Sequence, residues 1–530
     1  MRLHGTITLA ALLAQGAFAQ EAQRCADLTG FRLPSVEITA SSRAETPVAA
    51  CVVHGQIDRR IGVGGKTYYI GFELRLPDRW QSRFLFSGGG GMDGVVRPAT
   101  NGLDRGFAVV TTDAGHQADP ALRERDASFA VDQQARIDNG WRAIGRVTEV
   151  ARAIVQQYYG APAKYSYLDG CSNGGRQGLI AAQRFPLLFD GIVSGAPAFR
   201  VPYAAIGSAW ETIALTAIAP KDEAGRPILS RAFSDADLKV IADAVLKRCD
   251  SKDGLKDGMV FNTDACRDFD PSSLVCKGAK NDSCLSSAQL AALKKVIRGP
   301  VNSRGESIYS DWPYDPGIAS AGWRMLKLGN SQTAVPNSAD VNLMLAGLKG
   351  YFLTPLNPEF DVMKVDFDRD PARVREAAEE MDATSTMLST FSLKSKLLLY
   401  HGMADPFFSA WDTVRYFERV EQDNGGSARV GGWARLFLVP GMTHCAGGPA
   451  PDQFDRIGAI VAWVEEGRAP ERIIATGRSF PGVSRPLCPW PGYARYTGKG
   501  PESEASSFVC TLPGDKIHRA DSRSASGQVQ

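Results

Sequence analysis

The sequence has no excess of one charge, no internal repeat and no apolar run long enough to cross a membrane. Its 60 Lys and Arg residues nearly balance its 58 Asp and Glu residues, which leaves a formal charge of +2. This balance argues against the strongly basic surface that binds nucleic acids or anionic membranes. A bilayer span needs about 20 apolar residues, whereas the first apolar run covers only residues 7–14. We therefore expect neither nucleic acid nor membrane as a partner.

The N-terminus has the pattern of a secretory signal peptide. Arg2 precedes the short apolar run, and Ala17-Phe18-Ala19 offers a small-x-small cleavage site before Gln20. We expect residues 1–19 to be removed and the mature protein to be secreted or periplasmic. A frayed terminus of a cytosolic protein is the alternative interpretation.

Ten cysteines follow the signal sequence, and an even number in an exported chain indicates disulfides. The sequence alone does not fix the pairing. Short separations favour three local pairs, namely Cys249 with Cys266, Cys276 with Cys284, and Cys488 with Cys510. Cys171 and Cys445 are far apart in the sequence, and each stands beside a candidate catalytic residue.

Strand-like and helix-like segments alternate in two parts of the chain, which predicts an α/β fold with a mostly parallel sheet covered on both faces. Residues 135–159 carry apolar side chains at the three-to-four spacing of an amphipathic helix. Strand-like runs cover residues 68–76, 83–86, 107–112, 165–168, 192–195, 396–400 and 435–439.

The alternation breaks between about residues 198 and 396, where we expect an inserted lid domain. The length of 530 residues suits one large domain with an insertion as well as several domains. We expect the α/β domain to comprise residues 20–198 and 396–511, and the lid to comprise residues 199–395. The last segment, residues 512–530, has the composition of a disordered tail.

The motif Gly170-Cys171-Ser172-Asn173-Gly174 lies between a predicted strand and a predicted helix. Gly-x-Ser-x-Gly in this context is the pattern of a nucleophile elbow, a strained turn that exposes the serine. A plain Gly/Ser turn is the alternative. The pattern predicts Ser172 as a nucleophile, which needs a base and an acid that orients the base.

The partners of Ser172 are expected at later strand ends, in the order Ser, Asp, His. Asp405 follows strand 396–400 and His444 follows strand 435–439. We therefore predict that His444 is the base and that Asp405 orients it. His401 is the main rival to His444, but it precedes Asp405 and would reverse the order. Asp412 is the rival to Asp405.

A developing oxyanion needs two backbone N–H donors. We expect one from Asn173, the residue after the nucleophile, and the other from the glycine run at residues 88–91. Gly91 is the predicted donor, with Gly90 as the alternative, because glycine lets the backbone approach the substrate closely.

Three aspartates follow Cys249 at spacings of three and four, with glycines after two of them: Asp250, Asp253 and Asp257. The segment lacks the spacing and terminal Glu of an EF-hand. A tight oxygen-lined loop for Ca²⁺ and a solvated acidic turn both fit this pattern.

These motifs together resemble the tannase and feruloyl esterase family of α/β hydrolases, which also contains mono(2-hydroxyethyl) terephthalate hydrolases. The resemblance covers nearly the whole mature chain and rests on the Cys-Ser pair in the elbow, the Asp and the His-Cys pair. It implies the triad Ser172, Asp405 and His444, a Cys171 to Cys445 disulfide and a Cys25 to Cys51 disulfide.

The resemblance also implies a structural Ca²⁺ site in the lid. The expected ligands are the side chains of Asp250, Asp253 and Asp257 and the carbonyls of Leu255 and Met259. No other cofactor is implied.

Two departures argue against a dedicated terephthalate role. Family members that act on terephthalate esters have an acidic residue after the nucleophile, where this chain has Asn173. They also use a lid arginine for the free carboxylate, and residues 337–360 contain none.

The leading hypothesis is a secreted serine carboxylesterase that cleaves esters of aromatic, phenolic acids and is of the feruloyl esterase or tannase type. Phe408, Trp323 and Tyr351 are candidates to stack on the substrate ring, with core packing as the alternative. Terephthalate monoester hydrolysis, a non-catalytic binding protein and a Cys171 nucleophile are the rival hypotheses. The sequence does not predict the oligomeric state.

Overall fold

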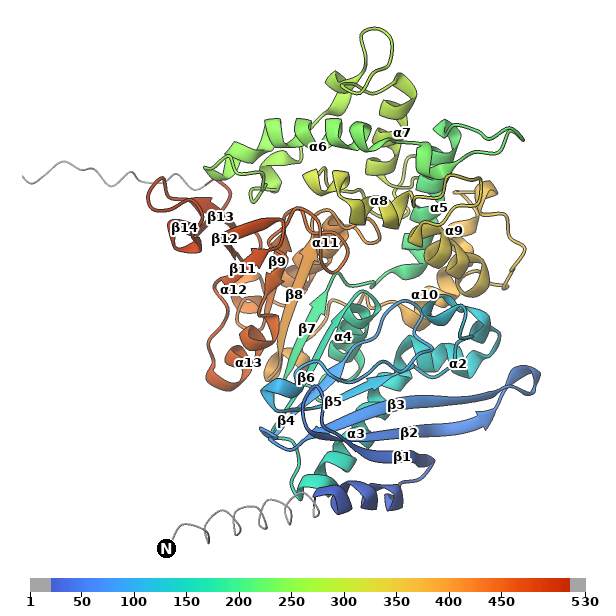
Figure 1. The fold of residues 1–530 in the computed structure, drawn as a ribbon, viewed down its shortest axis with the longest axis vertical. Helices are drawn as coiled ribbons and strands as arrows, with labels where there is room; N and C mark the ends of the chain where they lie inside the picture. The colour runs from blue at the N-terminus through green and yellow to red at the C-terminus, as the bar shows by residue number, and fades with distance from the viewer. Residues whose placement is uncertain (1–20, 515–530) are drawn as a thin grey trace, which may run out of the picture.

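A nine-stranded sheet forms the centre of the computed structural model, which describes residues 21–514 (Figure 1). The strand order is β1-β2-β3-β5-β4-β6-β7-β8-β9. The strands are β1 (Val36–Ala44), β2 (Ala50–Ile61), β3 (Thr67–Pro77), β4 (Arg83–Ser87), β5 (Phe107–Thr112), β6 (Tyr165–Cys171), β7 (Gly191–Gly195), β8 (Lys396–Gly402) and β9 (Ala434–Val439). The six strands from β5 to β9 in this order are parallel, and β1 to β3 form an antiparallel meander at one edge.

Helices cover both faces of this sheet because successive strand residues point to opposite sides. Leu168 packs into a core cluster on one face, and its neighbour Tyr167 packs into a second cluster on the other. The second face is covered by α13 (Arg456–Glu466), which contributes Ile460 and Trp463. The first face is covered by α3 (Ala143–Tyr159), α4 (Asn173–Arg184) and α11 (Ala410–Asp423).

A long insertion separates β7 from β8. Within residues 21–514, the segment 199–395 adds no strand to the nine-stranded sheet. Figure 1 shows it, in green through yellow to orange, beyond the carboxyl ends of β7 and β8. Its elements are α5 (Val201–Ile218), α6 (Asp235–Cys249), α7 (Ser287–Arg298), α8 (Ala321–Lys327), η12 (Asp340–Leu345), η13 (Leu348–Phe352), α9 (Asp370–Arg373) and α10 (Arg375–Met381). A capping box formed by Ser286 and Gln289 begins α7.

A buried ion cluster ties three lid elements together. The Lys327 ammonium of α8 lies 2.5 Å from the Glu211 carboxylate of α5 and 3.1 Å from the Asp340 carboxylate of η12. Ser208 of α5 donates a hydrogen bond of 2.7 Å to Asp340. Separation of η12 from α5 would leave a buried charge unpaired, which is energetically costly. The cluster therefore fixes η12 against α5.

The C-terminal part adds two small sheets. They comprise β10 (Gln453–Phe454), β11 (Ile473–Gly477) and β12 (Phe480–Leu487), and β13 (Tyr493–Tyr496) and β14 (Phe508–Thr511). The predicted signal peptide lies outside the described residues, as does the predicted tail from residue 515 onward. Across the described range, we find no helix with the length and apolarity that a membrane span requires.

Five disulfides use all ten cysteines. They join Cys25 to Cys51, Cys171 to Cys445, Cys249 to Cys266, Cys276 to Cys284 and Cys488 to Cys510. These are the three pairs favoured by short separation and the two pairs implied by the family resemblance.

Candidate active site

Ser172 occupies a strained turn between β6 and α4. Its backbone has φ 63° and ψ −122°, a conformation that is unfavourable for a residue with a side chain. A Cβ on Gly170 would lie 2.5 Å from the carbonyl of Gly174, and a Cβ on Gly174 would lie 2.9 Å from the carbonyl oxygen of Gly89. The turn therefore needs glycine at both flanking positions, as the elbow motif predicts.

The glycine run lies against the start of α4 and is held there by hydrogen bonds. The N–H of Gly174 donates to the carbonyl of Gly89 at 3.0 Å, and the N–H of Gly89 donates to the Gln177 side chain at 3.0 Å. Gln177 in turn donates to Asp93 at 2.8 Å. These hydrogen bonds hold residues 88–93 beside Ser172 through Asp93, a buried aspartate that the sequence motifs did not indicate.

The two predicted oxyanion donors lie at the same pocket as Ser172. Gly91 and Asn173 both line it, and Asn173 is the first residue of α4, where backbone N–H groups have no partner within the helix. The polar atoms of the Asn173 side chain are already hydrogen-bonded, because its amide N–H donates to Asp93 and its oxygen accepts from Arg176. Its backbone N–H is therefore the part of Asn173 that is suited to bind an oxyanion.

Asp405 and His444 form a direct hydrogen bond. The Nδ1 atom of His444 lies 2.7 Å from Oδ2 of Asp405, and Oδ1 of Asp405 accepts the N–H of Phe407 at 2.8 Å. Burial alone would raise the pKa of Asp405, but the charge of His444 and hydrogen bonds from both His444 and His401 hold it well below its ordinary value. Asp405 is therefore ionised and able to orient an imidazole.

Neither rival residue occupies the place of a triad member. Asp412 pairs with Arg200 at 3.0 Å. His401 is fully buried behind Asp405, with its Nε2 atom 3.2 Å from the same Oδ2 atom that contacts His444. The sequence pattern predicted His401 only as an alternative base. Its position four residues before Asp405 was the one sequence feature that pointed to this contact.

The Cys171 to Cys445 disulfide ties the nucleophile's turn to the loop that carries His444. Its two Cα atoms are 5.9 Å apart, although 274 residues separate them in the sequence. Since Cys171 precedes Ser172 and Cys445 follows His444, the disulfide brings these two residues into proximity. A thiol in a disulfide is not a nucleophile, so the structure contradicts the hypothesis of a Cys171 nucleophile.

The pocket at Ser172 is small, with a volume of about 30 Å³, and mostly apolar. Phe407 and Phe408 line it, and their rings lie 5.0 and 5.6 Å from the His444 ring. Tyr351 and other side chains of η12 and η13 close it from the lid. Trp323 is not brought to this pocket, because it packs into the lid core beside Leu238 and Leu293.

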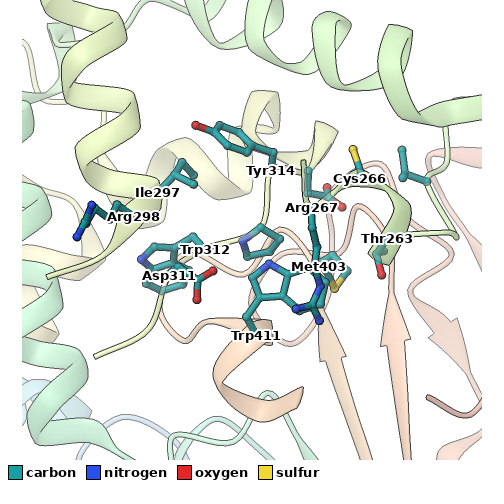
Figure 2. A pocket seen from close by; sticks show the side chains of 13 residues that line it. Thr263, Cys266, Arg267, Ile297, Arg298, Asp311, Trp312, Tyr314, Met403 and Trp411 are labelled. Atoms are coloured by element: carbon teal, nitrogen blue, oxygen red, sulfur yellow. The ribbon is translucent and has the colours of Figure 1, made fainter. Parts of the chain in front are cut away.

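A larger cavity of about 320 Å³ lies elsewhere, at the contact between the lid and the α/β domain (Figure 2). Trp312, Tyr314 and Trp411 line it, and the Arg267 guanidinium lies 4.0 Å from the centre of the Trp411 ring. Neither Ser172, Asp405 nor His444 borders this cavity. Its size therefore does not make it the reaction site.

The three predicted calcium-binding carboxylates lie in one compact loop. Asp250 accepts backbone N–H groups of residues 257 and 258, Asp253 accepts that of Phe261 at 2.9 Å, and Asp257 pairs with Arg485. Burial, together with the negative charges of Asp257 and Asp250, raises the pKa of Asp253 to about 7. Among residues 21–514, no group of three or more His, Cys, Asp or Glu side chains is arranged to hold a metal.

Comparison with known proteins identifies a family that the chain matches. Residues 51–511 match the model of the family described as tannase and feruloyl esterase. The chain is 41% identical to mono(2-hydroxyethyl) terephthalate hydrolase of Piscinibacter sakaiensis over 516 residues, which cover 87% of this chain and 85% of the relative. It is 30% identical to a probable feruloyl esterase of Arthroderma benhamiae, with 95% and 97% covered.

Solved structures agree on the fold. Feruloyl esterase B from Aspergillus oryzae has a TM-score of 0.78 at 24% identity, with 93% of this chain and 100% of that chain covered. Tannin acyl hydrolase from Aspergillus niger has a TM-score of 0.71 at 22% identity, with 93% and 94% covered. The predicted α/β-hydrolase fold is confirmed.

Proposed function

Because the chain belongs to the tannase and feruloyl esterase family and is a carboxylic ester hydrolase, we propose that it cleaves esters of aromatic acids through a covalent acyl-enzyme. Ser172, His444 and Asp405 are its proposed triad. The observation that carries this proposal is the disulfide that joins Cys171, next to the strained Ser172, to Cys445, next to the His444 that is hydrogen-bonded to Asp405.

In the proposed mechanism, Nδ1 of His444 donates to Asp405, which leaves Nε2 to accept the Ser172 hydroxyl proton. The Ser172 oxygen bonds to the ester carbonyl carbon, and the N–H groups of Asn173 and Gly91 stabilise the oxyanion. His444 then protonates the departing alcohol as the ester C–O bond breaks. Water, deprotonated by His444, attacks the acyl-enzyme, and the acid leaves as Ser172 regains its proton.

The pocket walls favour an uncharged aromatic acyl group. Among the described residues that line this pocket, none has a charged side chain. A free carboxylate in such a site would lose its hydration without gaining a partner. An aromatic acyl group is larger than the space present, so we expect Leu343 and Met344 of η12 to move when it enters.

A panel of esters tests this assignment. We expect methyl ferulate or methyl gallate to give the highest kcat/KM, with mono(2-hydroxyethyl) terephthalate below both and methyl butyrate as the control without a ring. A terephthalate monoester that ranks first would contradict the substrate class but not the family. Failure to hydrolyse any ester would contradict the proposed function and favour a binding protein.

The loop after Cys249 is the proposed Ca²⁺ site, with carboxylate ligands from Asp250, Asp253 and Asp257 and carbonyl ligands from Leu255 and Met259. Oxygen donors suit Ca²⁺, and a bound cation would offset the negative charge of the three neighbouring carboxylates. The ion would stabilise the lid without taking part in the reaction.

Calcium removal gives a direct measurement of this proposal. We expect EDTA to lower the Tm and CaCl₂ to restore it, because a ligand of the folded state stabilises it by mass action. Asp253→Asn should abolish the response. An unchanged Tm in EDTA, with no calcium found by elemental analysis, would contradict the site.

We also propose that the protein is exported. Five disulfides suit an oxidising compartment and are rare in the cytosol. Cell fractionation with N-terminal sequencing of the mature protein tests this, and a first residue near Gln20 is the expected result.

A further inference from the structure

One oxygen of Asp405 contacts two histidines. Its Oδ2 atom lies 2.7 Å from Nδ1 of His444 and 3.2 Å from Nε2 of His401. The His444 side chain is partly exposed, at 12%, whereas His401 has no exposed surface. The reaction proposed above assigns no part to His401, although it touches the residue that orients the base.

The neighbours of His401 determine where its proton lies. Its Nε2 atom faces two acceptors, the carboxylate of Asp405 and the backbone carbonyl of Phe408 at 3.0 Å. Only a protonated Nε2 satisfies them. Its Nδ1 atom lies 2.8 Å from the Thr413 hydroxyl of α11, which is able to donate to a neutral imidazole. The contacts therefore favour a neutral ring with the hydrogen on Nε2.

We propose that His401 is a positioning residue of the active site. Through its Nε2–H group it holds the Asp405 carboxylate so that Oδ2 meets the Nδ1–H of His444, and Thr413 fixes the ring in the required tautomer. Oδ1 of Asp405 is held separately by the N–H groups of Phe407 and Phe408 at 2.8 and 3.2 Å. Both oxygens are thus fixed before a substrate binds.

The hydrogen bond from His401 also weakens Asp405 as an acceptor. A carboxylate that shares its charge with a second donor stabilises the imidazolium form of His444 less strongly. Loss of the His401 donor should therefore make Asp405 a stronger acceptor for His444 while it relaxes the orientation of the carboxylate. These two effects are separable, because the orientation of Asp405 controls kcat, whereas its strength as an acceptor controls the acidic limb of the pH profile.

His401→Leu and His401→Gln test the proposal. Leucine removes the donor, whereas the glutamine amide places an N–H group near the position of Nε2. This test rests on the proposed esterase function. For His401→Leu we expect a kcat lower by about 10–100-fold, since small displacements of a catalytic group cost up to about 100-fold. KM should change less than about threefold. The acidic limb of the pH profile should move to higher pH by about half a unit. His401→Gln should recover most of the lost kcat.

His116→Leu is the matched control, because His116 is also fully buried but stacks on Phe129 instead of touching the triad. We expect it to lower stability without moving the pH limb. Equal losses in folded His401→Gln and His401→Leu, or an unmoved pH limb in His401→Leu, would overturn the proposal. If His401→Leu fails to fold, Thr413→Val takes its place in the test. For Thr413→Val we expect a kcat loss of about 3–10-fold. An unchanged kcat in this variant would overturn the role of His401.

A readout independent of activity separates this inference from the proposed function. In protein labelled with ¹⁵N-histidine, the ring shifts of His401 should show a protonated Nε2 and an unprotonated Nδ1. The opposite tautomer would overturn the proposal even if the protein hydrolyses aromatic esters. The predicted tautomer would support the positioning contact even if the esters of the panel are not its substrates.

Discussion

Removal of the Cys171 to Cys445 disulfide should lower both the stability of the protein and its catalytic rate. The disulfide closes a loop with a sequence separation of 274 residues. The chain-entropy relation gives about 5–6 kcal/mol of stabilisation for such a loop, which is an upper limit because engineered and native disulfides often give less. Cys171→Ala with Cys445→Ala should therefore lower the free energy of unfolding by up to that amount.

The catalytic effect is separate from this loss of stability. The disulfide holds the Cα atoms of the two residues beside Ser172 and His444 at 5.9 Å, and a displacement of about 1 Å costs up to about 100-fold in rate. We expect kcat to fall by about 10–100-fold in protein that circular dichroism shows to be folded. Urea unfolding gives the stability of the same sample.

The Cys25 to Cys51 disulfide provides the matched control, because its residues are only 26 positions apart and it joins the segment before β1 to β2, away from Ser172. Its double alanine variant should lose up to about 3–4 kcal/mol of stability and keep kcat within about twofold. A folded Cys171→Ala, Cys445→Ala variant with wild-type kcat would refute the reasoning that this disulfide sets the active-site geometry.

Three further changes probe separate parts of the site. Gly174→Ala places a Cβ 2.9 Å from the Gly89 carbonyl oxygen. It should lower the free energy of unfolding by about 1–3 kcal/mol in thermal unfolding and kcat by at least tenfold. Gly278→Ala is the control, because Gly278 has open space around it, and it should change neither stability nor kcat. Asp405→Asn should lower kcat by about 10³–10⁴-fold. Because the pKa of folded Asp405 lies below the unfolded value of 3.8, the wild type's stability advantage over this variant should be full at neutral pH and shrink in urea titrations as the pH falls below about 4. Phe408→Ala should raise KM, whereas Trp323→Ala should lower only the Tm, and a reversed pattern in steady-state kinetics would contradict the pocket assignment.

The sequence predicted the features that depend on local chemistry and chain order. Ser172, Asp405 and His444 each follow a buried strand, and parallel neighbours bring their carboxyl ends to one edge. The glycines at 170 and 174 were predictable because a tight turn excludes a Cβ, and the structure shows the backbone atoms that a Cβ would strike.

The features that the sequence did not predict depend on tertiary contacts. The strands β1 and β2 were missed, and the placement of β5 between β3 and β4 has no local signal. The turns η12 and η13 are π-helical and lack the 3.6-residue pattern used to find helices. Trp323 was proposed as a substrate contact because it is aromatic. An aromatic side chain is equally suited to a hydrophobic core, and Trp323 packs into the lid core.

His401 shows the same limit at the active site. The order Ser, Asp, His argued against it as the base, and the structure places it behind Asp405 instead. Its contact depends on the turn at residues 402–405, where the N–H of Asp405 donates to the carbonyl of Gly402 at 3.2 Å. A sequence pattern gives the spacing of the two residues but not the direction in which each side chain points.

Covalent labelling of the nucleophile tests the central claim most directly. The native protein is incubated with a fluorophosphonate probe, and the adduct is located by peptide mass spectrometry. We predict one adduct per chain, on Ser172, with ester hydrolysis lost in proportion to labelling and no adduct in Ser172→Ala. Hydrolysis that persists after complete labelling, or full activity in Ser172→Ala, would contradict the account.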